Sequence, residues 1–93
     1  MLKITGGKGF HITFDNGVTV SVQFGWGNYC DNRNKRENPE EFFLESKNAE
    51  IAIFNEEGDW LTKQYDSTLE DDVKGYVEVK EILDALNWAS KQT

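Results

Sequence analysis

The sequence predicts an α+β fold: a small antiparallel sheet built from two β-hairpins, with one C-terminal amphipathic helix packed on one face. Three patterns predict it. Apolar and polar residues alternate strictly around a glycine turn near the N-terminus, a similar turn recurs within residues 50 to 64, and apolar residues recur at helical spacing after residue 79. A chain of 93 residues has the length of one domain. Residues 1 to 93 are therefore expected to form a single domain, with room for a surface site but hardly for a deep cavity.

The first hairpin is expected between Phe10 and Phe24, around the turn Asp15-Asn16-Gly17. A two-residue turn would set Phe14 opposite Thr19 and pair apolar with polar side chains. A three-residue turn with Gly17 in the left-handed region sets Phe14 opposite Val18 and places every apolar residue on one face. The other face is expected to be solvated or to form a polar site. It carries His11, Thr13, Thr19, Ser21 and Gln23.

The second hairpin is expected from Glu50 to Gln64, with its turn at Asn55-Glu56-Glu57-Gly58 and Phe54 paired with Trp60. A short strand is expected at residues 75 to 77, after an acidic loop at residues 66 to 72. The helix is expected from Val79 to about Ser90. At its margin, Trp88 is expected to pack against the rest of the domain.

Two other stretches allow more limited statements. Gly6 to Gly9 lacks the spacing of a phosphate-binding loop and is expected to be a flexible lead-in to the first strand. Asn38-Pro39 has the character of a helix start, so Phe42 to Leu44 could follow in a short helix. The same phenylalanines could instead open a strand, and both alternatives stay open.

Charge is unevenly distributed along the chain. The formal net charge is −7, and residues 50 to 72 hold eight acidic residues against Lys63 alone. Such a surface repels a phosphate backbone, so direct nucleic-acid binding is not expected, whereas a basic protein partner is permitted. The chain shows no signal peptide or membrane segment and has one cysteine. A cytoplasmic location without membrane contact is expected.

Residues for catalysis or metal binding are scarce. A Cys-His pair is available only between Cys30 and His11, and no third orienting group accompanies them. A structural zinc site needs four ligands of these types, and the acids at residues 70 to 72 lack the pattern of a calcium loop. The sequence therefore predicts no enzyme, no catalytic residue, no metal and no cofactor.

The segment from Phe24 to Arg36 has the composition of a binding surface. Aromatic rings offer stacking faces, amides offer hydrogen bonds, and arginines offer positive charge, which together suit a nucleotide. The alternative is a packed bend of the chain. The candidate ligand contacts are Trp26, Asn28, Tyr29, Asn32, Arg33 and Arg36.

Several short motifs resemble those of small uncharacterised proteins encoded by phages and prophages. They are Gly7-Lys8-Gly9-Phe10, Thr13-Phe14-Asp15-Asn16-Gly17, Ser21-Val22-Gln23-Phe24-Gly25, Gly27-Asn28-Tyr29-Cys30 and, more weakly, Ala49-Glu50-Ile51-Ala52 with Gly58-Asp59-Trp60-Leu61. The resemblance spans most of residues 7 to 61. It brings no activity and no residue roles. It implies a context in which small phage proteins act by stoichiometric binding, including against host defence.

Three hypotheses follow for the function. The first is a non-enzymatic phage-type binding protein that counters host defence by sequestering a nucleotide-like signal, with a homo-oligomer supplying a missing cavity wall. The second is an acidic inhibitor of a host defence nuclease complex of the CRISPR type. Its contacts would be Glu56, Glu57, Asp59 and Asp66. The third is a structural phage component without a small ligand.

Overall fold

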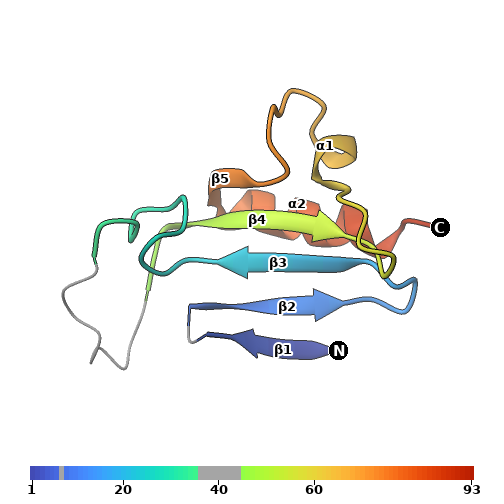
Figure 1. The fold of residues 1–93 in the computed structure, drawn as a ribbon, viewed down its shortest axis with the longest axis horizontal. Coiled ribbons are helices and arrows are strands. Elements are labelled where there is room, and N and C mark those ends of the chain that lie inside the picture. The colour runs from blue at the N-terminus through green and yellow to red at the C-terminus, as the bar shows by residue number, and fades with distance from the viewer. Residues whose placement is uncertain (7, 36–44) are drawn as a thin grey trace.

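A five-stranded antiparallel sheet and one long helix form the domain. The computed structural model describes residues 1–6, 8–35 and 45–93. Neighbouring strands follow the chain order throughout, β1-β2-β3-β4-β5 (Figure 1). The strands are β1 Leu2–Thr5, β2 Gly9–Thr13, β3 Thr19–Gln23, β4 Asn48–Phe54 and β5 Lys74–Glu78, and the helices are α1 Thr62–Tyr65 and α2 Val79–Ser90. The α+β class, the antiparallel sheet and the C-terminal helix are those that the sequence predicts.

The hairpin of β2 and β3 has the predicted three-residue turn. The amide of Phe14 donates to the carbonyl of Val18, and Gly17 donates back to Phe14, both at 2.9 Å. Gly17 has a φ of +83°, in the left-handed region that other residues avoid. The turn also holds the end of α2, because the Asn16 side-chain amide donates to the carbonyl of Ala89 at 2.8 Å. This long-range bond adds a donor to a carbonyl of the last helical turn, which also accepts the amide of Gln92 at 3.3 Å.

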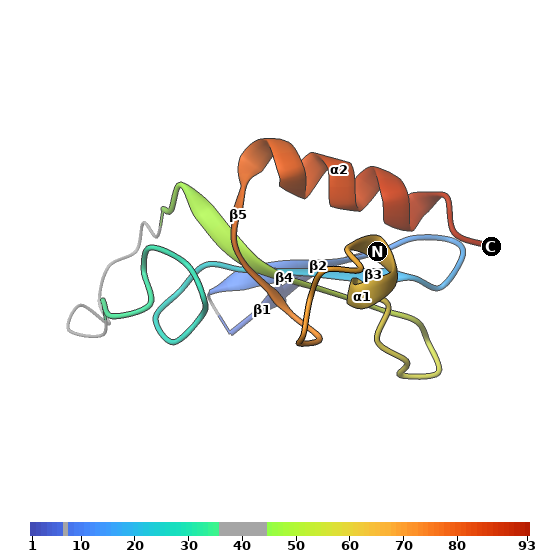
Figure 2. The same cartoon turned by 90° about the horizontal axis from the view of Figure 1, so that it is seen from above.

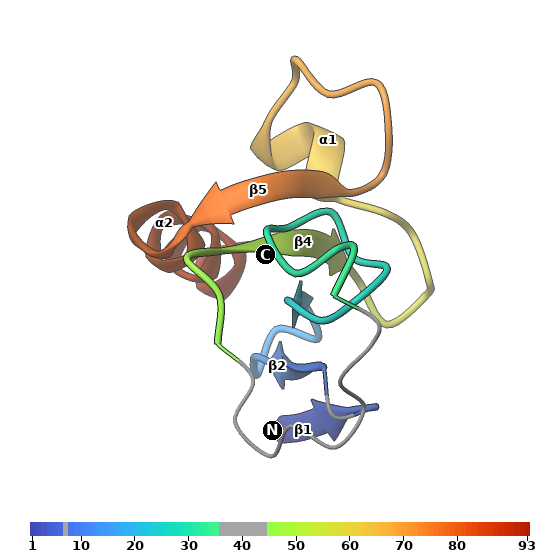
Figure 3. The same cartoon turned by 90° about the vertical axis from the view of Figure 1, so that its left-hand side faces the viewer.

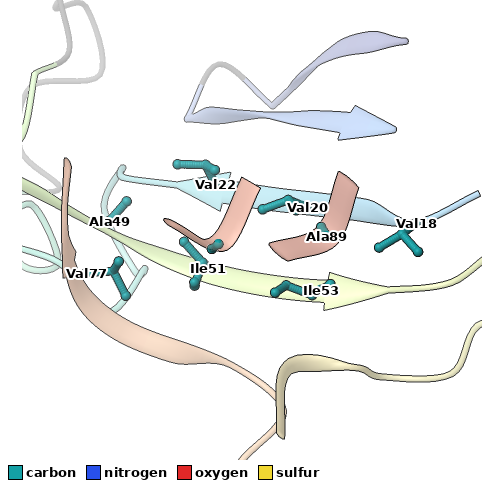
Figure 4. Packing of buried hydrophobic residues seen from close by; sticks show 9 residues of the cluster. Val18, Val20, Val22, Ala49, Ile51, Ile53, Val77 and Ala89 are labelled. Carbon is teal, nitrogen blue, oxygen red and sulfur yellow. The ribbon is translucent and has the colours of Figure 1, made fainter. Parts of the chain in front are cut away.

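The core lies between the sheet and α2. Val20 pairs across to Ile53 and Val22 to Ile51, so their side chains share one face. Helix α2 runs along that face (Figure 2). Figure 4 shows the apolar side chains of β3 and β4 beside the helix ribbon. The buried cluster consists of Val18, Val20, Val22, Ala49, Ile51, Ile53, Val77, Ala85 and Ala89.

The opposite face of the sheet is polar and hydrogen-bonded within itself. The hydroxyls of Thr13 and Thr19 lie 2.8 Å apart. The Gln23 side-chain amide donates to the hydroxyls of Thr5 and Ser21, at 2.6 and 3.2 Å. These groups satisfy one another, so this face is a cross-strand hydrogen-bonded surface.

The predicted second hairpin is only partly present. Phe54 and Trp60 pair as expected, but as an isolated bridge. The chain then turns into α1 instead of continuing as a strand. The reason is Thr62, which is fully buried and whose hydroxyl accepts the amide of Ile53 at 2.9 Å. A side chain thus takes the place of a backbone ladder, and the expected return strand is wrong beyond residue 60.

Strand β1 was not expected. Leu2 pairs with Ile12 and Ile4 with Phe10, so residues before Gly6 extend the sheet by one strand. The expected flexible lead-in at Gly6 to Gly9 is instead the connection between β1 and β2, although Gly7 lies outside the described residues. Strand β1 has four residues, of which only Leu2 and Ile4 are apolar, so its alternation is too short to predict a strand from the sequence.

Helix α2 and its margin match the prediction. It begins at Val79 and ends at Ser90. Trp88 packs edge-on against Tyr65, with ring centroids 5.7 Å apart. The open question of Phe42 to Leu44 falls outside the described residues. Among those that the structure describes, no helix is both long and apolar enough to cross a membrane.

Candidate functional site

The loop that follows β3 is folded tightly on itself. The amide of Asn28 donates to the carbonyl of Gly25 at 3.2 Å, and the side-chain oxygen of Asn28 accepts the amide of Gly25 at 3.0 Å. Gly27 donates to the carbonyl of Arg33, and Arg33 donates to that of Cys30. These bonds cross the loop from both sides. Residues 25 to 33 therefore form an ordered loop, called the platform below.

Buried polar and thiol groups hold the loop from inside. Asn32 is only 2% exposed, and its side-chain amide donates to the carbonyls of Phe24 and Glu45, both at 2.8 Å. Cys30 is buried, with its Sγ 3.6 Å from the carbonyl of Gly25. Asn32 was expected to contact a ligand. Its side chain joins the end of β3 to the chain entering β4, and almost none of its surface is exposed.

The backbone of Tyr29 bonds the loop to strands β4 and β5. Its amide donates to the Glu50 carboxylate and its carbonyl accepts the amide of Tyr76, both at 2.8 Å. Gly75 permits this approach, because a Cβ there would lie 2.6 Å from the Cβ of Tyr29. The loop therefore lies beside β4 and β5 at one end of the sheet (Figure 3).

Two aromatic rings on the outer side of the loop each carry a cation. Trp26 is 48% exposed, and the Lys8 ammonium lies 4.9 Å from its ring centroid while donating to the Trp26 carbonyl at 3.1 Å. Tyr29 is 39% exposed, and the Arg33 guanidinium lies 4.6 Å from its ring centroid. Each such contact contributes about 0.5–1 kcal/mol at an exposed site. The loop thus holds two cations in place beside two partly open aromatic surfaces.

The six expected ligand contacts are distributed unequally. Trp26 and Tyr29 are partly exposed, and Arg33 lies over the Tyr29 ring, whereas Trp26 is paired with Lys8. Asn28 is half-buried and uses its side-chain oxygen within the loop, as described above. Asn32 is internal, and Arg36 lies outside the described residues.

Lys8 is a site residue that the sequence reasoning missed. It belongs to the segment before β2, and Phe24 donates its amide to the Lys8 carbonyl at 2.8 Å. The hairpin register contains the signal: if Phe10 pairs with Val22, then two residues further Lys8 pairs with Phe24. That extension brings Lys8 next to Gly25, at the base of the loop.

Two open depressions lie beside the platform. One, of about 400 Å³, is lined by Asp31, Asn32, Lys35, Glu45, Ser46 and Lys47. The other, of about 470 Å³, shares Asp31 and Lys47 and continues to the start of α2. The Asp31 carboxylate accepts the side-chain amide of Asn48 at 3.0 Å, so its charge is partly engaged. The depressions combine lysine ammonium groups with the carboxylates of Asp31, Glu45 and Glu78 and with amide and hydroxyl groups.

Of the two residues weighed for catalysis, Cys30 is buried inside the platform and His11 lies apart from it. His11 is on the polar face of β2, with its ring edge-on to Phe54 at 5.7 Å. Partial burial, and then the charge of Lys3, hold the pKa of His11 below its ordinary 6.5. No hydrogen bond joins His11 to Cys30 in residues 1–6, 8–35 and 45–93. The same ranges contain no cluster of three His, Cys, Asp or Glu side chains placed to hold a metal ion.

The acidic residues of the second hypothesis divide into two groups. Glu56, Glu57 and Asp59 are exposed on the turn after β4, and the Asn55 side chain orders that turn by accepting the amides of Glu57 and Asp59. Asp66 is separate. Its carboxylate pairs with the Lys74 ammonium at 2.8 Å and accepts the Thr68 hydroxyl, which lowers its pKa to about 2. Asp66 therefore joins the acidic loop to β5 and does not belong to the exposed group.

Comparison of the chain with protein-family models, with curated proteins and with solved structures finds no match.

Proposed function

We propose that the protein is a non-enzymatic binding module that holds a nucleotide-like ligand on the loop of Trp26, Tyr29 and Arg33. The observation that carries the proposal is the pair of cation-bearing aromatic rings on a loop fixed by its own hydrogen bonds. A base would stack on a ring, and a phosphate would meet the ammonium of Lys8 or the guanidinium of Arg33. Because the cations are already ordered, binding loses less conformational entropy than it would with mobile side chains.

The overall negative charge is compatible with a small anionic ligand. Exposed charges more than about 8 Å apart are largely screened at physiological ionic strength. A small ligand therefore responds to the charges nearest the loop, of which Lys8 and Arg33 lie over the two rings and Glu50 accepts the Tyr29 amide. A long polyanion would also meet the acidic segment of residues 50 to 72 and be repelled.

The biological role that we attach to this binding is sequestration of a signal nucleotide in the host cytoplasm. The resemblance of residues 7 to 61 to small uncharacterised phage and prophage proteins supports that role, because small phage proteins without catalytic residues often act by stoichiometric binding. A sequestering protein needs affinity and abundance but no catalytic group.

Calorimetric titration against a panel of cyclic and linear nucleotides tests the proposal, with inorganic phosphate and a nucleoside as partial ligands. Stacking of one base contributes about 1–3 kcal/mol, so Trp26→Ala should weaken binding by about 5- to 150-fold. Trp60→Ala is the matched control, because Trp60 is 50% exposed but lies on the turn after β4. Absence of heat from every nucleotide, or equal losses in the two variants, would refute the proposal.

A second candidate function rests on the exposed acidic turn. Glu56, Glu57 and Asp59 make no ion pair with any described residue. A basic groove on a protein partner, such as a host nuclease complex of the CRISPR type, would complement them. Neutralising all three should then abolish partner binding and its salt dependence. Nucleotide binding at the Trp26 loop should be unchanged in that variant.

A further inference from the structure

We infer that strand β1 is a self-association edge, through which two copies of the chain join their sheets antiparallel about a two-fold axis. The starting observation is that, within the part of the chain that the structure describes, β1 pairs with β2 alone and forms one end of the sheet (Figure 1). An edge strand presents unpaired amide and carbonyl groups that can accept another strand. Its residues Leu2 and Ile4 are 76% and 82% exposed.

The alternation of hydrogen-bonded positions along β1 shows which of its backbone amides and carbonyls have no partner in β2. Met1 and Thr13 exchange both bonds, with Met1 N to Thr13 O at 2.7 Å and Thr13 N to Met1 O at 2.9 Å. In an antiparallel pair such bonded positions alternate, so Lys3 also bonds toward β2. The amides and carbonyls of Leu2 and Ile4 consequently point outward, away from the sheet.

The sequence of β1 is self-complementary about Lys3. If two copies pair antiparallel with Lys3 at the axis, Leu2 of each copy stands opposite Ile4 of the other. Their outward groups then exchange about four backbone hydrogen bonds. Both residues lie on the α2 side of the sheet, sharing that face with Ile12 and Phe10. A shift of one residue would place lysine opposite isoleucine, so the facing of the side chains selects this register.

The distribution of charge favours a second copy as the occupant of this edge. Strand β1 contains Lys3 and no acid, whereas the eight acids within residues 50 to 72 lie in β4 or between β4 and β5, toward the other edge of the sheet, with Glu56 reaching back to Gly17. Joining two copies through β1 therefore keeps their acidic regions as far apart as the sheet allows. The two Lys3 side chains at the axis still repel each other, because like charges directly opposite on paired strands are destabilising.

The opposite edge of the sheet is unsuited to the same pairing. Tyr76 in β5 has a φ of +54°, and its amide is already bonded to the carbonyl of Tyr29. The pairing of β4 with β5 also shifts register between Ala49 and Ile51. Irregularities of this kind prevent continuous pairing with a further strand. Only the β1 edge is regular, so association should stop at two copies.

The test combines sedimentation velocity with amide exchange over protein concentrations from about 1 μM to about 1 mM, the range of weak to moderate affinities. The expected mass rises from 10.7 kDa toward twice that value. Protection of the Leu2 and Ile4 amides should rise in parallel. Lys3→Gln should tighten the dimer and reduce its salt dependence, because it removes the like charges at the axis.

Ile4→Pro is the decisive variant, because proline removes the outward amide while leaving the bonds of Lys3 to β2 in place. It should be monomeric throughout, with an unchanged circular dichroism spectrum. Ile4→Lys provides a second disruption that keeps the amide. Leu83→Ser is the matched control, since it removes an exposed leucine from α2 and should dimerise like the original. A chain that stays monomeric, or a dimer that survives both Ile4 changes, would overturn the inference.

Discussion

Replacing Asn32 with alanine should destabilise the domain and loosen the candidate site together. The Asn32 side chain is 2% exposed and donates to the carbonyls of Phe24 and Glu45. Alanine removes both donors and leaves two partly buried carbonyls without them. Each lost partner costs about 1–3 kcal/mol, with the lower end applying where water can enter. A total of about 2–4 kcal/mol follows, against a usual stability of about 5–15 kcal/mol for a domain.

Urea unfolding, followed by tryptophan fluorescence and circular dichroism, measures this loss. Asn34→Ala is the control within the same loop: Asn34 is exposed and makes no hydrogen bond to a described residue, so its loss should stay within about 0.5 kcal/mol. The midpoint temperature of thermal unfolding should fall by roughly 8–30 °C in the Asn32 variant, because a chain of this size loses about 4–8 °C per kcal/mol of stability. A loss below about 1 kcal/mol, or equal losses in the two variants, would refute the role assigned to Asn32.

An aspartate at the same position adds a test with a definite sign. Asn32→Asp places a carboxylate against two carbonyl oxygens, so burial and repulsion should raise its pKa above the usual value. The protonated acid can donate one hydrogen bond, whereas the carboxylate can donate none. The variant should therefore gain stability relative to the original chain as the pH falls through this raised pKa. A pH-independent difference would contradict the geometry around Asn32.

Two further predictions concern the connection from β4 to β5. Thr62→Val keeps the shape of the side chain but leaves the buried amide of Ile53 without its acceptor, so urea unfolding should report a loss of about 1–3 kcal/mol and amide exchange at Ile53 should accelerate. Asp66 has a pKa lowered from 3.8 to about 2, chiefly by its hydrogen bond from Lys74. Its stabilising contribution is complete above pH 3.8 and should disappear as the pH falls toward 2, and Lys74→Met should flatten that dependence in unfolding curves recorded at each pH.

The parts of the fold that the sequence predicted have local causes. Alternation around Asp15-Asn16-Gly17 determines both the turn and the facing of β2 and β3, because a shift of one residue would expose every apolar side chain. The apolar stripe from Val79 to Ser90 determines α2 in the same way. In each case the information lies within about a dozen residues. Trp26, Tyr29 and Arg33 were singled out on composition alone; the structure leaves both rings partly exposed and pairs Arg33 with Tyr29.

Other features depend on contacts between distant parts of the chain. Thr62 ends the second hairpin because its hydroxyl reaches Ile53 across the turn, and threonine at a strand position gives no sign of this. Asn32 was grouped with the exposed amides, since an asparagine that binds a ligand and one that bonds buried carbonyls look alike in a sequence. Lys8 was missed because its place beside Trp26 follows from the hairpin register extended two residues beyond the apolar pattern.

The sequence by itself determined the α+β class, the three-residue turn, the helix and the stretch that carries the candidate site, since these follow from periodicity and from the conformational freedom of glycine. Only the tertiary structure decided which polar side chains point inward and which strand ends the sheet. Burial and hydrogen-bond partners depend on which segments meet in space. For Asn32, Thr62 and β1, those segments lie well apart along the chain or carry too few residues for a periodic pattern.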